Sequence, residues 1–399
     1  MFVHRTAPGD RIRLALTKEA GRWARGRIVE LVQSGPRRRE APCPYYDRCG
    51  GCTLQHLEYS TQVESKGRVV TDALRRIGGL EAFPEPELVA SPVEWRYRNR
   101  VTFTLRRSGA SVTAGFHALE DPRRVVDVDE RCLLPEGPLG EAWGALRRSW
   151  GPGAVHLPAG AELHLTLRVT RQGAVLLLVE GGRGRGNPER LLEQAAPLRA
   201  IWKARARRGA SARLLAGEGR LEEEWFGERI DLLPGAFLQG NRAAAERLHE
   251  AVLGELGSIR GKRLLDAYCG FGLYGLLAAR AGAKVVGIES DPGALRLAER
   301  FRAEGLRVLA GTVGARLAEA LPVDVAILNP PRVGVEPGVA ESLAGGVGER
   351  IVYVSCDPAT LARDVRRMGD VFRITRLQVF DLLPQTAHAE VVLTLDRGR

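Results

Sequence analysis

Apolar and polar residues follow three successive patterns along this chain. Over residues 1–40 they alternate, as in RIRLAL and GRWARGRIVELV, which is typical of short strands with one face in water. Residues 41–235 are mixed: a helical pattern covers residues 59–77, and two pairs of strands are expected, RNRVTFTLRR with VTAGFHA and ELHLTLRVT with GAVLLLVEG. The chain therefore begins with a small β unit and continues into a region of helices and strands.

From residue 236 to residue 399, short apolar runs alternate with helical segments. The runs are LLDAY, AKVVGIES, VDVAILNPP, ERIVYVSC and HAEVVLTLD. Apolar strands separated by helices predict a mostly parallel sheet that helices cover on both faces. We expect an α/β protein of three domains: a small β domain at 1–40, an α+β domain at 41–235 and a Rossmann-like domain at 236–399.

Charge adds a partner to this picture. The chain of 399 residues has a formal net charge of +11, which favours a polyanionic partner, most simply nucleic acid. Arginines and lysines cluster at residues 37–39, 96–107 and 203–213, although any single run is also typical of a solvated surface. No stretch of about 18 apolar residues occurs, so we expect a cytoplasmic protein with no membrane segment. No pattern indicates an obligate protein partner.

A glycine-rich turn, DAYCGFGL, follows the first apolar run of the third region. Glycines such as Gly270 let the backbone approach a ligand at the carboxyl end of a sheet, although a tight turn without a ligand looks the same. Glu289 ends the next run, where a carboxylate can accept ribose hydroxyl groups, and Asn329 follows the VDVAIL run. Because a GxGxxG pyrophosphate cradle is absent, these loops favour S-adenosylmethionine over a dinucleotide.

Cys356 ends the ERIVYVS run, so its side chain is expected at the same sheet edge. A small cysteine at a strand end is often structural, but a thiolate near cationic groups and a cofactor is also a nucleophile. Such a thiolate adds to C6 of a pyrimidine and makes C5 able to accept a methyl group. A base must then remove the C5 proton, and Glu390, which begins the last apolar run, is the candidate.

Four other cysteines have a spacing typical of metal ligands. Three lie close together and one lies far downstream: Cys43, Cys49, Cys52 and Cys132. Ligation by four thiolates suits zinc or an iron-sulfur cluster. The spacing favours the cluster, because zinc modules usually carry two C-x2-C pairs and the second pair is missing here. Cys269, within the glycine-rich turn, is expected to be structural.

Seven motifs, in this order along the chain, resemble the iron-sulfur RNA uracil-C5 methyltransferases: CGGCTLQH, RYRNRVTF, FLQGN, DAYCGFG, NPPR, SCDPATLARD and HAEVV. The resemblance covers nearly the whole chain and is closest to the bacterial ribosomal-RNA type. It implies methyl transfer from S-adenosylmethionine to C5 of a uridine in RNA, with ribosomal RNA favoured over transfer RNA. It also implies that Cys356 forms a covalent adduct at C6 and that Glu390 is the proton-abstracting base.

The resemblance implies a class I methyltransferase domain at 236–399 and two sets of ligand contacts. The S-adenosylmethionine site would comprise Gln239, Tyr268, Gly270 of the glycine-rich turn, Glu289, Thr312 and Asn329, with Gly311 beside it. A [4Fe-4S] cluster would lie on Cys43, Cys49, Cys52 and Cys132. The N-terminal β unit resembles a TRAM barrel, of OB-like type, that has been shortened. Asn329 stands where the family usually has Asp, and Arg332 with the basic N-terminal half is expected to hold phosphate.

Three other functions remain open at this point. An RNA amino-nitrogen methyltransferase would use the NPPR loop to hold an exocyclic amine and would need no cysteine nucleophile. A cytosine-C5 enzyme also uses a thiolate, but its RNA members generally place cysteines on both loops. A non-catalytic iron-sulfur RNA-binding protein would explain the cysteines and the charge, but it would leave the expected position of Cys356 and Glu390 unexplained.

Overall fold

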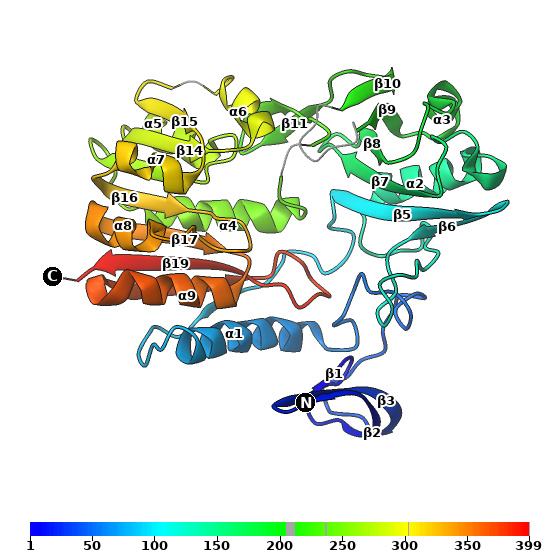
Figure 1. The fold of residues 1–399 in the computed structure, drawn as a ribbon, viewed down its shortest axis with the longest axis horizontal. Coiled ribbons are helices and arrows are strands. Elements are labelled where there is room, and N and C mark those ends of the chain that lie inside the picture. The colour runs from blue at the N-terminus through cyan, green and yellow to red at the C-terminus, as the bar shows by residue number, and fades with distance from the viewer. Residues whose placement is uncertain (205–211, 236–237, 302, 399) are drawn as a thin grey trace. The chain divides into compact units, whose positions relative to one another are not determined.

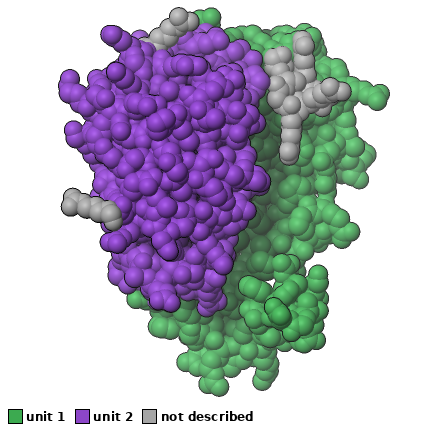
Figure 2. Space-filling view, turned by 60° about the vertical axis from the view of Figure 1, so that its left-hand side comes forward, with its two compact units in different colours: residues 1–62, 93–223, 383–387 green, residues 63–92, 224–382, 388–399 purple. Residues whose placement is uncertain are grey.

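The structure, a computed structural model, describes residues 1–204, 212–235, 238–301 and 303–398, and the chain divides into two compact units (Figure 2). Unit 1 comprises Met1–Gln62, Val93–Glu223 and Leu383–Ala387, and unit 2 comprises Val63–Pro92, Glu224–Leu382 and His388–Arg399. Residues 205–211 of the basic stretch, and Phe237 of the FLQGN motif, lie outside the described residues. The expected domain boundaries near residues 40 and 235 remain predictions.

Unit 1 contains two sheets (Figure 1). The N-terminal sheet has the order β1-β3-β2 and consists of β1 (Phe2–Val3), β2 (Arg11–Ala20) and β3 (Trp23–Gln33). The second sheet has the order β10-β9-β8-β7-β5-β6 and consists of β5 (Arg100–Ser108), β6 (Ser111–Gly115), β7 (Glu162–Val169), β8 (Val175–Glu180), β9 (Leu198–Lys203) and β10 (Arg213–Gly217). Both strand pairs expected in this region, β5 with β6 and β7 with β8, are confirmed.

The core of unit 1 lies on one face of the six-stranded sheet. Helices α2 (Gly137–Ser149) and α3 (Pro188–Gln194) pack there, and a short 3-10 turn, η1 (Pro152–Ala154), follows α2. Alternation along β5 buries Val101, Phe103 and Leu105 in this core. The Phe103 ring stacks on the Trp143 ring of α2, with ring centroids 4.1 Å apart. The period-2 pattern of RVTFTLRR thus separates a buried apolar face from a polar one.

Unit 2 is built on an eight-stranded sheet of order β15-β14-β13-β16-β17-β19-β18-β4. Its strands are β4 (Glu87–Val89), β13 (Arg263–Ala267), β14 (Lys284–Glu289), β15 (Leu306–Ala310), β16 (Val323–Leu328), β17 (Val347–Ser355), β18 (Phe372–Phe380) and β19 (Glu390–Arg397). The first five strands of this order are parallel, whereas β19 is antiparallel to both β17 and β18. The mostly parallel sheet is confirmed, but no expected apolar run covers β4, β15 or β18.

Helices cover both faces of this sheet (Figure 1). One apolar cluster joins the strands to buried residues of α1 (Tyr59–Arg76), α7 (Val313–Ala320), α8 (Val339–Gly346) and α9 (Pro358–Met368). Helices α4 (Arg242–Glu255) and α5 (Leu273–Arg280) bury their apolar residues outside that cluster. The remaining elements are the hairpin β11 (Glu222–Trp225) and β12 (Glu228–Asp231), helix α6 (Pro292–Ala298) and the 3-10 turn η2 (Gly369–Val371). Two-sided burial explains the near-continuous apolar runs of these strands.

Candidate active site and cysteine cavity

The predicted catalytic and cofactor residues of unit 2 meet at one edge of its sheet. Parallel strands end at the same edge, so Glu289 at the end of β14, Tyr268 after β13, Asn329 after β16 and Cys356 after β17 share it. Glu390 begins β19, which runs antiparallel, and therefore lies at the same edge. Since the chain order reverses between β13 and β16, this edge is the switch point where doubly wound sheets bind ligands.

Strand register brings Cys356 and Glu390 together. Ser355 of β17 pairs with Val391 of β19, so Cys356 and Glu390 are the next residues on neighbouring strands. Asp357 then caps α9, its side chain accepting hydrogen bonds from the backbone N–H groups of Ala359 (3.0 Å) and Thr360 (2.9 Å). This cap turns the chain into the helix directly after the thiol, as the Asp-Pro pair predicts.

Burial and a nearby cation shift the pKa values of these two residues in opposite directions. Burial is the largest cause that raises the pKa of the Cys356 thiol, and Glu390 raises it further, while the nearby Arg332 guanidinium lowers it. Burial raises the pKa of the Glu390 carboxyl to about 7, and Arg332 acts against this rise as well. Arg332, expected to hold phosphate, is thus the cation beside both candidate catalytic groups.

The cofactor side of the edge is organised by Glu289. Its carboxylate accepts hydrogen bonds from the backbone N–H groups of Gly270 (2.8 Å), Ser290 (2.7 Å) and Asp291 (2.6 Å). It therefore ties the glycine-rich turn to the end of β14. Tyr268 has a left-handed backbone with φ of 62°, and its hydroxyl donates to the Glu336 carboxylate. Glu336 was not expected at this site, and no local motif marks it.

The other predicted cofactor residues also belong to unit 2. Thr312 caps α7 and accepts a hydrogen bond from the backbone N–H of Ala315 (3.3 Å). Asn329 is half-buried, and its backbone N–H donates to the carbonyl of Ala267 (3.3 Å). Gln239 is half-buried shortly before α4. These positions are compatible with a shared ligand site, and their roles remain predictions.

A buried carboxyl that the sequence analysis did not assign supports the glycine-rich turn. Asp266, in β13, is fully buried and accepts a hydrogen bond from the backbone N–H of Gly275 in α5 (2.9 Å). Burial raises the pKa of Asp266 to about 7. An acidic residue inside the apolar run LLDAY was the sequence signal for such an internal contact.

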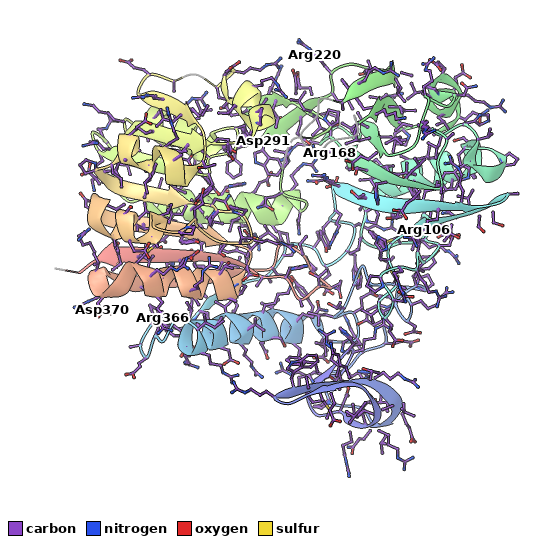
Figure 3. All side chains as sticks on the ribbon, in the orientation of Figure 1. Arg106, Arg168, Arg220, Asp291, Arg366 and Asp370 are labelled. Carbon is purple, nitrogen blue, oxygen red and sulfur yellow. The ribbon has the colours of Figure 1, made fainter. Side chains whose placement is uncertain are left out.

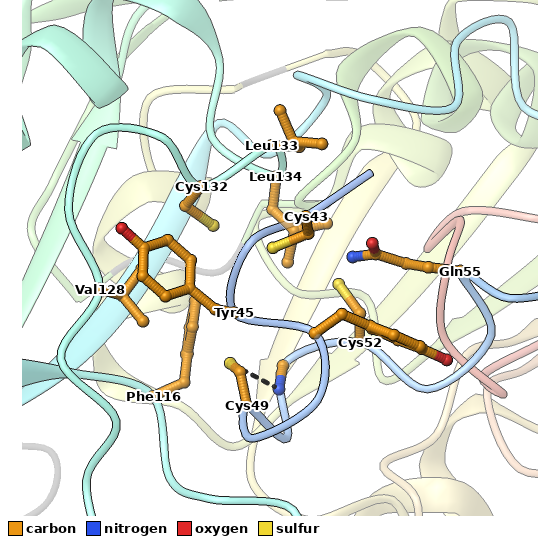
Figure 4. A pocket seen from close by; sticks show the side chains of 12 residues that line it. Cys43, Tyr45, Cys49, Cys52, Gln55, Phe116, Val128, Cys132, Leu133 and Leu134 are labelled. Carbon is orange, nitrogen blue, oxygen red and sulfur yellow. Dashed lines mark hydrogen bonds between the residues drawn. The ribbon is translucent and has the colours of Figure 1, made fainter. Parts of the chain in front are cut away.

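The four predicted metal-ligating cysteines line a single cavity in unit 1. Figure 4 shows the thiols of Cys43, Cys49, Cys52 and Cys132 around one space. Most other lining residues are apolar or aromatic, including Tyr45, Phe116, Val128, Leu133 and Leu134. The Sγ atom of Cys49 accepts a hydrogen bond from the backbone N–H of Gly51 (3.3 Å). The long gap in sequence between Cys52 and Cys132 is closed by the fold.

The geometry of this cavity bears on which metal group would fit. Within the part of the chain that the structure describes, no three His, Cys, Asp or Glu side chains are arranged to hold a single metal ion. Burial raises the pKa of both the Cys52 and the Cys132 thiol to about 12. Iron-sulfur clusters are commonly held by four thiolates, and the assignment of a cluster to this cavity remains a prediction.

Several arginines of the predicted RNA-binding clusters make internal contacts instead. Arg38 pairs with the buried Asp10 at 3.1 Å, and Arg39 pairs with Glu94 at 2.9 Å. On β5, Arg106, which Figure 3 labels, pairs with Glu162 at 2.7 Å. The arginine runs therefore serve the fold in part, which their local sequence does not reveal. Among the described residues, no helix is both long and apolar enough to cross a membrane.

The chain is similar in sequence to a family model and to several known proteins. Residues 313–398 match the family model described as tRNA (Uracil-5-)-methyltransferase. A protein of Gloeobacter violaceus named as an uncharacterized RNA methyltransferase is 34% identical, over 100% of this chain and 92% of its own. The 23S rRNA (uracil(1939)-C(5))-methyltransferase RlmD of Chromohalobacter salexigens is 31% identical, over 100% and 84%. The corresponding Pseudomonas putida enzyme is 32% identical, over 100% and 89%.

A solved structure gives the same result for the fold. The tRNA (uracil-54, C5)-methyltransferase of Pyrococcus abyssi, in complex with S-adenosyl-L-homocysteine, has a TM-score of 0.74 and 27% identity, and the match covers 98% of this chain and 95% of that one. The chain is more than 30% identical, along its whole length, to two enzymes named as uracil-C5 methyltransferases, and it has the fold of a third. These similarities establish its family. The chain belongs to the S-adenosylmethionine-dependent RNA uracil-C5 methyltransferases.

Proposed function

We propose that this enzyme methylates C5 of a uridine in ribosomal RNA through a covalent adduct between Cys356 and C6 of the base. The observation that carries the proposal is the placement of Cys356 and Glu390 on neighbouring strands, with Arg332 influencing both. A uracil ring at this edge would meet a nucleophile and a base together. An amino-nitrogen methyltransferase would need neither of these groups.

The first half of the reaction uses the thiol. The Cys356 thiolate adds to C6 of the uracil, and the electron pair of the C5–C6 double bond moves to make C5 nucleophilic. Carbon 5 then takes the methyl group of S-adenosylmethionine, whose sulfonium becomes the neutral thioether of S-adenosylhomocysteine. Arg332 favours the thiolate because a cation nearby stabilises the charged form of the thiol.

The second half of the reaction uses the carboxylate. Glu390 removes the proton from C5, the C5–C6 double bond forms again, and the Cys356 sulfur leaves as a thiolate. A carboxyl with a pKa raised to about 7 accepts a proton more readily than an ordinary glutamate. Because only the deprotonated form is a base, the elimination rate should rise as pH increases through about 7.

The other loops at the edge would bind the methyl donor. Glu289 would accept hydrogen bonds from the ribose hydroxyl groups, and Gly270 would let the backbone pass close to the ligand. Tyr268, Gln239, Thr312 and Asn329 would complete the site. Asn329 lacks the charge of the family's usual Asp, and its amide can both donate and accept hydrogen bonds.

A [4Fe-4S] cluster on Cys43, Cys49, Cys52 and Cys132 would stabilise the part of unit 1 that these cysteines join. The shared cavity and the all-thiol donor set support this assignment. The proposed methyl transfer moves no net electrons, so the role that we propose for the cluster is structural. We retain residues 1–40 as a TRAM-like β domain, residues 41–235 as the cluster domain and residues 236–399 as the methyltransferase domain.

Ribosomal RNA is the favoured substrate because the named 23S rRNA enzymes match this whole chain at 31% and 32% identity. The transfer-RNA enzyme from Pyrococcus abyssi shares 27%. The test is methyl transfer from labelled S-adenosylmethionine to unmodified 23S rRNA and, in parallel, to unmodified transfer RNA. We expect 5-methyluridine in 23S rRNA by nucleoside mass spectrometry; a methylated amino nitrogen, or product only in transfer RNA, would contradict the proposal.

A further inference from the structure

The turn that carries Arg332 follows β16, which pairs in parallel with β17, the strand that ends just before Cys356. It connects β16 to α8 and is held by side chains of α9. Within the turn, the backbone N–H of Gly334 donates to the carbonyl of Pro331 (2.8 Å). The Arg363 guanidinium donates to the carbonyl of Val333 (2.7 Å). The backbone N–H of Val335 donates to the Asp364 carboxylate (3.0 Å). Two consecutive residues of α9 therefore hold the backbone directly after Arg332.

Asp364 is the centre of this attachment. It is fully buried, on the side of α9 that also buries Leu361, Val365 and Met368. Besides the Val335 N–H, its carboxylate accepts the Tyr353 hydroxyl (2.9 Å) and the Arg363 Nε–H (2.9 Å). A buried carboxylate is costly unless it is hydrogen-bonded and paired, and both conditions are met here.

Gly334 shows how closely the turn approaches α9. Its φ of 79° lies in the left-handed region, and a Cβ atom at this position would collide with both the Arg363 guanidinium and the Asp364 carboxylate. Glycine is therefore required by conformation and by space. The turn therefore packs closely against α9, the helix that begins just after Cys356.

We propose that Asp364, together with Arg363, is a positioning residue that fixes the Pro331–Val335 turn so that the Arg332 guanidinium lies beside the Cys356 sulfur. Asp364 touches neither substrate nor cofactor in this account and acts only through Arg332. The inference deepens the proposed function, because its catalytic meaning rests on Cys356 as the nucleophile.

A purely structural role for Asp364 makes a different prediction. Loss of a buried hydrogen-bonded carboxylate would then lower stability without a specific effect on the thiol. A positioning role instead requires that the Asp364 and Arg332 substitutions act on the same property and do not add. The charged groups that influence Cys356 are Arg332 and Glu390, so the reactivity of the thiol reports on the placement of the arginine.

The experiment measures alkylation of Cys356 by iodoacetamide over a range of pH, with the modified peptide quantified by mass spectrometry. The variants are Arg332→Gln, Asp364→Asn, the double variant, and Arg363→Ala as a milder change that leaves the buried carboxylate in place. The matched control is Arg366→Ala, an exposed arginine of the same helix (Figure 3). Thermal unfolding and S-adenosylhomocysteine binding verify that each variant is folded.

We expect alkylation at pH 7 to slow by about tenfold in Arg332→Gln and Asp364→Asn, with no further loss in the double variant, because a lost cation lowers the thiolate fraction. Arg363→Ala should shift the profile in the same direction, and Arg366→Ala should match the wild type. Wild-type alkylation in folded Asp364→Asn and Arg363→Ala, or additive losses in the double variant, would overturn the proposal. A different result would contradict the proposed function itself: a wild-type enzyme that forms no covalent adduct with 5-fluorouridine RNA. The two failures can therefore be told apart.

Discussion

Cysteine thiols occur in two contrasting surroundings in this protein, the cavity of unit 1 and the sheet edge of unit 2. In the cavity, four thiols share a mostly apolar space, and burial raises the pKa of Cys52 and Cys132 to about 12. At the sheet edge, the half-buried thiol of Cys356 lies near a cation and a carboxyl. We propose metal ligation for the first arrangement and covalent catalysis for the second, a distinction that rests on the surroundings rather than on the residue type.

The largest predicted effect separates the two kinds of thiol. Cys356→Ser should reduce methyl transfer by more than about a thousandfold, because serine is a far weaker nucleophile at neutral pH. Iron content and the unfolding midpoint should stay at wild-type values. Both are measured on the same preparation as the methyl-transfer assay, and substantial activity in the folded variant would remove the distinction between edge and cavity.

The second prediction concerns the carboxyl at the edge. Glu390→Gln should slow turnover by about a hundredfold or more, because the adduct forms but loses its C5 proton slowly. Ordinary substrate RNA should then remain covalently attached and appear as a shifted band in denaturing electrophoresis. A slow variant that leaves all of its RNA free would place the defect before elimination and would exclude Glu390 as the base.

The third prediction concerns the cavity. Cys132→Ser should remove most of the bound iron and lower the free energy of unfolding by at least about 2 kcal/mol, since loss of a metal group is among the changes that destabilise most. Cys269→Ser is the matched control, because Cys269 lies outside the cavity. Iron analysis and chemical denaturation under anaerobic conditions provide the readout; equal iron in both variants would contradict the cluster assignment.

The smallest predicted effect is a change of stability with pH. The pKa of Glu390 is raised to about 7 by burial, so its protonated form stabilises the folded state fully below the ordinary pKa near 4.5, and this contribution is lost as pH rises through 7. Glutamine cannot ionise. Glu390→Gln should therefore gain stability relative to wild type between pH 5 and pH 8, on the order of 2 kcal/mol.

Denaturant unfolding at the two pH values measures this difference. Glu341→Gln, an exposed glutamate of α8, is the control and should show the same difference from wild type at both values. An unchanged difference for Glu390→Gln would mean that this carboxyl is ionised throughout the range and is not tuned for proton abstraction.

The strands of both units could be predicted from sequence where a local pattern carried them. The apolar runs before Asn329 and Cys356 are buried on both faces, and the alternating run of β5 is buried on one. Several strands lie outside the expected runs, among them β4 and β18: β4 has only three residues, and the mixed sequence FRITRLQVF of β18 has no single period. Pairing with distant strands, rather than local pattern, determines these two elements.

The sequence indicated candidate residues for the site, but not the hydrogen bonds and ion pairs that hold them in place. Motifs indicated Cys356 and Glu390 as candidates, and the register of β17 with β19 explains why residues so separated in sequence lie on neighbouring strands. Contacts such as Arg38 with Asp10, or Asp364 with Val335, join segments far apart in the chain and have no local signature. One usable signal was overlooked: an aspartate at position 364, between the apolar positions of an amphipathic helix.

The central claim is that Cys356, and none of the cavity thiols, forms a covalent bond to the base. The most direct test incubates wild-type enzyme with 5-fluorouridine-containing RNA and S-adenosylmethionine, then maps the attached peptide by mass spectrometry. Fluorine at C5 cannot be removed as a proton, so the account predicts a stable adduct on Cys356 that is absent in Cys356→Ser. An adduct on Cys43, Cys49, Cys52 or Cys132, or no adduct with any ribosomal or transfer RNA, would contradict it.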